Sequence, residues 1–216
     1  MTPDSRPEDT SPRTPTAAWQ RLREGNARFV AGESMHPNQD ASRRQSVAGG
    51  QHPFAVIFGC SDSRLAAEII FDLGLGDAFV VRTAGQVIDD AVLGSIEYSV
   101  ANLGTPLIMV LGHDSCGAVS AAHDVAGSGR MPRGFQRDLI ERIMPSVLET
   151  QRRGHEDVNS AVVEHTKQTA SRLMEQSRVI ADAVSNGDVA VVGVFYHLED
   201  GEAELVHGHG TWLPGR

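Results

Sequence analysis

Residues 54–64 read FAVIFGCSDSR, a short apolar run followed by a turn that carries Cys60, Asp62 and Arg64. An uncharged run of this length is typical of a strand buried on both faces. Similar runs occur at 78–82 (AFVVR), 107–111 (LIMVL) and 189–198 (VAVVGVFYHL). Each predicts a further strand of the same sheet.

The segments between these runs have helical periodicity. We expect helices at 17–30, 66–71, 89–103, 118–125 and 138–151, and one long helix over 156–186 that ends at Gly187. In the segment 89–103, for example, Val92, Ile96 and Val100 recur on one helical face. Asp200-Gly201 predicts a turn into a fifth strand at 202–206. The expected fold class is therefore α/β: a central, mostly parallel sheet of four parallel strands and one antiparallel edge strand, flanked by helices.

Three segments are expected along the chain. Residues 1–15, rich in proline and polar residues, predict a disordered tail. Residues 16–50 form an N-terminal helical arm, and residues 51–216 form the single α/β domain. Trp19, Leu22 and Asn26 share one face of the arm helix, which packs on its own domain or on a partner subunit.

Composition narrows the function classes. The 216 residues include 19 Lys+Arg and 28 Asp+Glu, a net charge of −9 that argues against nucleic-acid binding. The longest clean apolar run, 189–196, is too short to span a membrane. The N-terminus has no apolar core typical of a secretory signal, so a cytoplasmic location is expected. The two cysteines, Cys60 and Cys116, are expected to be free thiols there.

The polar residues that follow the strands suggest a metal site. Cys60 follows the first strand, His113 follows the third through Gly112, and Cys116 comes three residues later. Because ligands bind at the carboxyl ends of parallel strands, we expect these three side chains to converge. Two sulfurs and an imidazole suit Zn²⁺, and three protein ligands leave a fourth position open, as in catalytic zinc sites.

Asp62 and Arg64 offer two states for that fourth position. Asp62 can coordinate the same ion in a closed state, or Arg64 can hold the carboxylate in a bidentate pair so that water enters. A structural zinc permanently closed by Asp62 is the alternative to a catalytic one. By contrast, His165 is expected to be a satisfied core or interface histidine, and His207 and His209 are not expected to bind metal.

The two motifs resemble those of the β-class carbonic anhydrases. Residues 60–64 (CSDSR) match that family's Cys-x-Asp-x-Arg, and residues 113–117 (HDSCG) match its His-x-x-Cys-Gly. The resemblance implies a zinc lyase that hydrates CO₂ reversibly to bicarbonate and a proton through zinc-bound hydroxide. In that reading Cys60, His113 and Cys116 hold the metal, and Asp62 and Arg64 are catalytic.

The resemblance also implies a substrate pocket and an assembly. Gln51, Phe79, Tyr98 and Gly117 would line the CO₂ pocket, partly from a neighbouring subunit in a homodimer or homotetramer. Some members of the family bind bicarbonate at an allosteric site that uses a tryptophan three residues before the first cysteine. This chain has Ile57 there, which indicates the type that lacks that site.

Two thiolate ligands would leave a formally neutral zinc centre. We therefore expect a bound water with a pKa above the value of about 7 found with three histidines, and activity that rises into alkaline pH. At low pH Asp62 is expected to displace the water and silence the site. Two other functions stay open: hydrolysis of carbonyl sulfide or carbon disulfide on the same fold, and a zinc or redox sensor without turnover.

Overall fold

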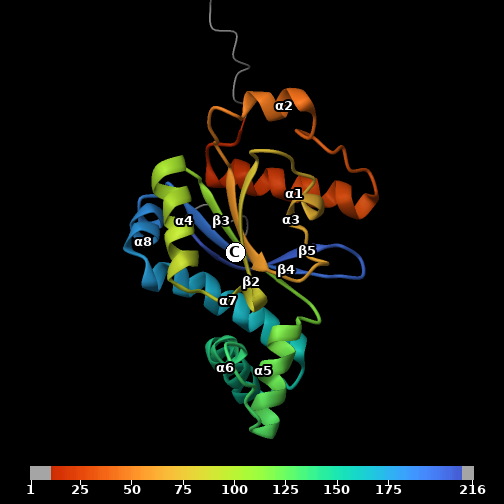
Figure 1. Ribbon diagram of the computed structural model, residues 1–216, viewed down its shortest axis with the longest axis vertical. Helices are drawn as coiled ribbons and strands as arrows, with labels where there is room; N and C mark the ends of the chain where they lie inside the picture. The colour runs from red at the N-terminus through yellow and green to blue at the C-terminus, as the bar shows by residue number, and fades with distance from the viewer. Residues whose placement is uncertain (1–10, 211–216) are drawn as a thin grey trace, which may run out of the picture.

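The computed structural model describes residues 11–210, and within them five strands form one sheet (Figure 1). The strands are β1 (Ala55–Cys60), β2 (Ala78–Thr83), β3 (Leu107–His113), β4 (Ala190–Tyr196) and β5 (Ala203–His209). Their order is β2-β1-β3-β4-β5; the first four are parallel and β5 is antiparallel. This confirms the predicted fold class.

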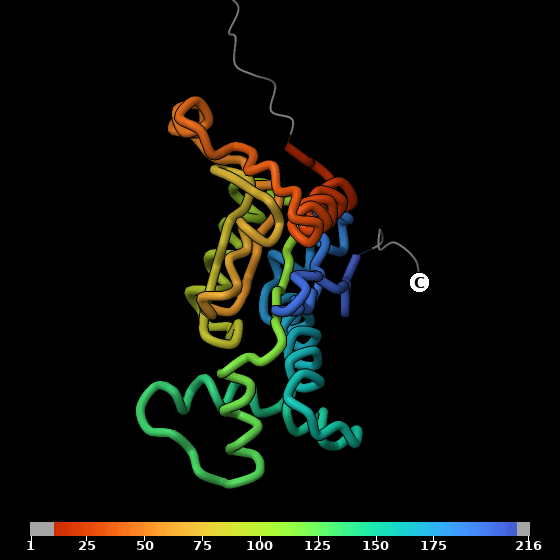
Figure 2. The backbone as a smooth tube through the Cα atoms, turned by 90° about the vertical axis from the view of Figure 1, so that its right-hand side faces the viewer, coloured from red at the N-terminus to blue at the C-terminus, as the bar shows by residue number. Residues whose placement is uncertain are grey.

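Helices cover the sheet on both faces. They are α1 (Pro15–Ala31), α2 (Ala41–Ser46), α3 (Ala67–Ile70), α4 (Asp90–Leu103), α5 (Gly117–Ser128), α6 (Gln136–Arg152), α7 (Val158–Gln176) and α8 (Arg178–Ser185). A short 3₁₀ turn, η1 (Ala84–Gln86), follows β2. Figures 1 and 2 show α5 and α6 lying together beyond the end of the sheet where β3 leads into α5.

Successive strand residues face two separate cores, as the pleat requires. Ile57 and Met109 belong to one core, which the buried faces of α1, α3, α5 and α6 complete. Phe58 and Val110 belong to the other core, with buried residues of α4, α7 and α8. Because both faces are covered, the three inner strands are apolar except for His113 at the end of β3, and the period of two that marks a half-exposed strand is absent from their sequences.

The prediction of one helix over 156–186 is wrong in one respect, because the helix is interrupted at Ser177. This residue has extended backbone angles (φ −115°, ψ 114°), and its hydroxyl accepts a hydrogen bond from the Ile180 N–H at 3.1 Å. Serine is a preferred N-cap, so it ends α7 and begins α8 although the apolar periodicity continues across it. Gly187 follows the end of α8 with a left-handed φ of 82°.

Helix α1 packs on its own chain. Ala18, Trp19 and Leu22 are buried in the first core, and Asn26 ties the helix to two other elements. Its side-chain N–H donates to the Gly201 carbonyl at 2.8 Å, and its oxygen accepts from the Ala203 N–H at 3.0 Å. The division into tail, arm and α/β domain stays a prediction, and residues 1–10 of the expected tail lie outside the described residues. No helix among those residues is long and apolar enough to cross a membrane.

Candidate metal centre

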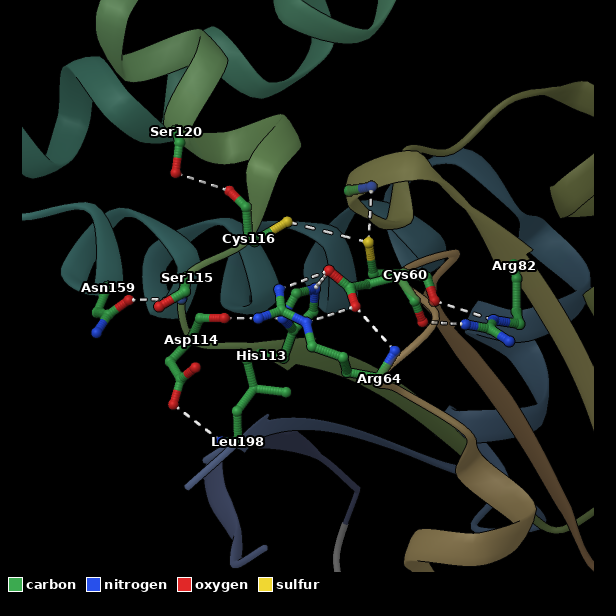
Figure 3. Close-up of polar contacts among 12 residues, drawn as sticks. Cys60, Arg64, Arg82, His113, Asp114, Ser115, Cys116, Ser120, Asn159 and Leu198 are labelled. Atoms are coloured by element: carbon green, nitrogen blue, oxygen red, sulfur yellow. Dashed lines mark hydrogen bonds and ion pairs between the residues drawn. The ribbon is translucent and has the colours of Figure 1, made fainter. Parts of the chain in front are cut away.

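Three metal-ligating side chains meet at the carboxyl ends of β1 and β3. Cys60 is the last residue of β1, His113 is the last residue of β3, and Cys116 immediately precedes α5. Their ligand atoms all lie within 4.8 Å of one another, and all three residues are buried. Figure 3 shows the two sulfur atoms facing each other above the imidazole. The parallel pairing of β1 with β3 brings them together.

His113 is oriented as a metal ligand. Its Nδ1 lies 2.8 Å from the carbonyl oxygen of Asp114, and since a carbonyl only accepts, Nδ1 carries the proton. Its Nε2 therefore presents a lone pair, and it is buried without a hydrogen-bond partner among the described residues. A buried nitrogen left unpaired is costly. Two sulfurs and this nitrogen are a donor set that fits Zn²⁺.

Hydrogen bonds to Asn159 and Leu198 hold the turn between His113 and Cys116. Ser115 has a left-handed φ of 52°, and its N–H donates to Asn159 Oδ1 at 3.0 Å. The carboxylate of Asp114 accepts from the Leu198 N–H at 3.0 Å. These contacts, visible in Figure 3, fix the turn so that both ligands point to the same place.

The two cysteines are free thiols whose pKa values shift in opposite directions. Their Sγ atoms lie 4.0 Å apart. The hydrogen bond from Cys116, together with that from the Gly85 N–H, lowers the pKa of Cys60 to about 4 although burial opposes the shift. The same bond raises the pKa of Cys116, because its proton is held by the Cys60 thiolate. Even without a metal, the site stabilises one thiolate, the form that binds metal.

Asp62 is held by Arg64. The guanidinium donates from Nε to Oδ1 at 3.0 Å and from its terminal nitrogen to Oδ2 at 2.8 Å, and the Arg64 backbone N–H donates to Oδ1 at 2.9 Å. The side-chain hydrogen bonds from Arg64 lower the pKa of Asp62 well below its ordinary value. Asp62 Oδ2 lies 3.9 Å from His113 Nε2. The carboxylate therefore stands beside the three ligand atoms but is engaged by the arginine.

Arg82 holds the loop that follows β1, a role that was not predicted from the sequence. Its guanidinium donates to the carbonyl oxygens of Cys60 at 3.0 Å and Asp62 at 2.6 Å, across from the neighbouring strand β2. A charged residue at the carboxyl end of an otherwise apolar strand was the available signal. Gly117, which is expected to line the substrate pocket, is the first residue of α5.

Gln51, Phe79 and Tyr98 lie away from this centre within one chain. Gln51 precedes the amino end of β1, so the six-residue strand, about 20 Å long, separates it from Cys60. Phe79 pairs in register with Val56, near the same end. Tyr98 is 48 % exposed on α4, and its ring centroid lies 6.3 Å from that of Phe79.

Comparisons with known proteins agree with this site. A family model described as carbonic anhydrase matches residues 55–203. The chain is 56 % identical over 191 residues to carbonic anhydrase 2 of Mycobacterium tuberculosis, covering 88 % of this chain and 92 % of that protein. It is 54 % identical to a carbonic anhydrase of Mycolicibacterium smegmatis, with 88 % and 93 % covered. With its sheet, its sulfur and imidazole ligands and these relatives, the chain belongs to the β-class carbonic anhydrases.

Solved structures share the fold. The chain superposes on one of two tetrameric β-carbonic anhydrases from the filamentous ascomycete Sordaria macrospora with a TM-score of 0.71 and 24 % identity. That match covers 90 % of this chain and 100 % of the other.

Proposed function

We propose that this chain is a zinc enzyme that catalyses the reversible hydration of CO₂ to bicarbonate and a proton. The observation that carries the proposal is the buried group of Cys60, His113 and Cys116, with Asp62 engaged by Arg64 beside it. Zinc bound by these three residues would supply a nucleophile from water by lowering the pKa of that water. The identity to two bacterial carbonic anhydrases supports the same activity.

Asp62 and Arg64 act as a unit in this proposal. Arg64 keeps Asp62 ionised by lowering the pKa of its carboxyl group, and it fixes both carboxylate oxygens. The carboxylate can then accept a hydrogen bond from water or substrate beside His113 Nε2 and orient it for attack. Because Arg64 takes up the carboxylate, Asp62 would stay off a metal held by Cys60, His113 and Cys116, and water could reach that metal.

A stopped-flow assay of CO₂ hydration tests the proposal, with zinc measured in each preparation. We expect activity and about one zinc per chain for the wild type, loss of both for Cys60→Ala, and retained zinc with strongly reduced activity for Asp62→Ala. A zinc-loaded wild type that does not hydrate CO₂ would refute the proposed reaction. Turnover of carbonyl sulfide in preference to CO₂ would reassign the substrate.

The substrate pocket is proposed to form between two copies of the chain. Gln51, Phe79 and Tyr98 lie away from the metal centre of their own chain, and the tyrosine is half exposed. A neighbouring copy in a homodimer or homotetramer would bring these residues to the centre. Mixing Gln51→Ala and Cys60→Ala subunits tests this: if pockets are shared, a mixed dimer contains one intact site and one doubly altered site, and activity reappears on mixing.

We place the protein in the cytoplasm. Cys60 and Cys116 are free, and their proposed role requires that they stay reduced, which the cytoplasm favours. Fractionation of the native cells, followed by detection of the protein with an antibody, tests the assignment.

A further inference from the structure

We propose that His165 is a positioning residue for the metal centre: it clamps the backbone of Gly85 so that the Gly85 N–H donates to the Cys60 sulfur. The inference rests on the proposed zinc function but concerns residues outside the family motifs. It arises from three contacts that connect helices α6 and α7, the turn η1 and strand β1 through the interior of the chain.

Gly85 is the link to the metal ligand. Its N–H lies 3.3 Å from Cys60 Sγ, within hydrogen-bonding range for sulfur. Its φ of 68° lies in the left-handed region, and a Cβ there would come within 2.9 Å of side-chain atoms of Ala118 and Ile143. Only glycine fits this turn without strain, and the turn aims the N–H at the sulfur. A glycine, however, has no side chain to hold that conformation.

His165 supplies the missing restraint. Its Nε2 lies 2.8 Å from the carbonyl oxygen of Gly85, and because a carbonyl only accepts, Nε2–H is the donor. The residue is 1 % exposed, and burial, reinforced by the charge of Arg172, lowers the pKa of His165 to about 4. The imidazole is therefore neutral at pH 7 and carries its single proton on Nε2.

Ser146 contacts the other nitrogen of this imidazole. Its Oγ lies 3.1 Å from His165 Nδ1. The same hydroxyl donates to Gln168 Oε1 at 2.9 Å, and Arg172 donates to that amide oxygen at 3.1 Å. These hydrogen bonds hold the serine against the imidazole ring. Helix α6 thus orients the imidazole on α7.

The hydrogen bond from His165 acts on the metal site by fixing the backbone conformation of Gly85. The N–H and the C=O of Gly85 belong to different peptide groups, so His165 does not polarise the N–H directly; it fixes the residue that carries both. A hydrogen bond to a thiolate draws charge from the sulfur and favours the ionised ligand. Partners of this kind typically contribute 10- to 100-fold to metal affinity or activity.

Zinc affinity and a cobalt spectrum test the proposal without reliance on turnover. His165→Leu removes the donor with little change in volume, whereas His165→Gln keeps an N–H near the position of Nε2. Thr169→Val is the matched control, since Thr169 is buried one turn further along the same helix. Zinc dissociation constants come from competition with a chromophoric chelator, and Co²⁺-loaded protein reports the sulfur-to-cobalt charge-transfer band.

We expect His165→Leu to bind zinc at least about tenfold more weakly than the wild type and to shift the cobalt band to longer wavelength, because a thiolate without its donor releases an electron more easily. His165→Gln should restore most of both values, and Thr169→Val should match the wild type. If His165→Leu does not fold, Ser146→Ala should show a smaller change in the same direction.

Equal affinities and bands for His165→Leu and Thr169→Val would overturn the inference, as would a glutamine variant as impaired as the leucine variant. If His165→Leu cannot be folded, wild-type values for Ser146→Ala would do so. If the wild type binds zinc, none of these outcomes contradicts the proposed function. A wild type that binds no zinc would instead remove the proposed function itself.

Discussion

Arg64 grips Asp62 through two guanidinium hydrogen bonds, of 3.0 and 2.8 Å, while the carboxylate stands 3.9 Å from His113 Nε2. The two residues are separated by one position in the sequence, so the pair is local and needs no long-range contact to form. In the proposed function, this pair beside the ligand atoms would decide whether Asp62 can reach a bound metal.

Arg64→Ala should reduce CO₂ hydration by about 100-fold or more, because the released carboxylate is free to turn toward the metal. Arg64→Lys should retain only part of the activity, because an ammonium keeps the positive charge but cannot make the bidentate pair. Stopped-flow assays at pH 8 measure both. Arg137→Ala, which removes an exposed arginine paired with Glu141, is the control and should be fully active.

Arg82→Ala should lower CO₂ hydration by about 10- to 100-fold while zinc remains bound, because small misplacements of a catalytic group are costly. The variant frees the carbonyl oxygens of Cys60 and Asp62 from their shared donor. Zinc analysis beside the kinetics separates this effect from metal loss. Wild-type kinetics for Arg82→Ala would show that the loop needs no clamp.

Asn26→Leu should lower the free energy of unfolding by about 3 kcal/mol, since it strands the Ala203 N–H and the Gly201 carbonyl inside the protein. Urea unfolding followed by circular dichroism measures the change. Gln20→Ala, on the exposed face of the same helix, should shift the value by less than about 0.5 kcal/mol. A similar small shift for both variants would mean that Asn26 does not anchor the helix.

His165 should make the fold sensitive to acid. Its pKa falls from an ordinary 6.5 to about 4 in the folded chain. Between these values the unfolded chain binds a proton that the folded chain does not, so stability falls as the pH drops from about 6.5 to 4, by up to about 3 kcal/mol. Above pH 7 this contribution vanishes.

Unfolding experiments at pH 7.5 and 5 measure the dependence as the difference between the wild type and His165→Gln, which cancels other titrating groups. Parallel loss of stability in the two proteins would assign the acid sensitivity elsewhere.

The sequence predicts those parts of the site that depend on local order and on sheet topology. Cys60 and His113 each end a recognisable apolar strand, and parallel neighbours place such residues at one edge. Arg82 left one signal in the sequence, a charge at the end of an apolar strand, but the residues that it contacts could not be predicted. The proposed contribution of His165 could not be predicted either, because it reaches the site from an element that is distant in the sequence. The helix break at Ser177 was missed for a different reason: the serine cap is local, but the apolar periodicity continues across it.

X-ray absorption at the zinc edge of the purified protein most directly tests the proposed coordination of zinc by Cys60, His113 and Cys116. We predict two Zn–S distances of about 2.3 Å together with nitrogen or oxygen ligands at about 2.0–2.1 Å. Protein that contains no zinc, or zinc surrounded only by nitrogen and oxygen, would contradict it.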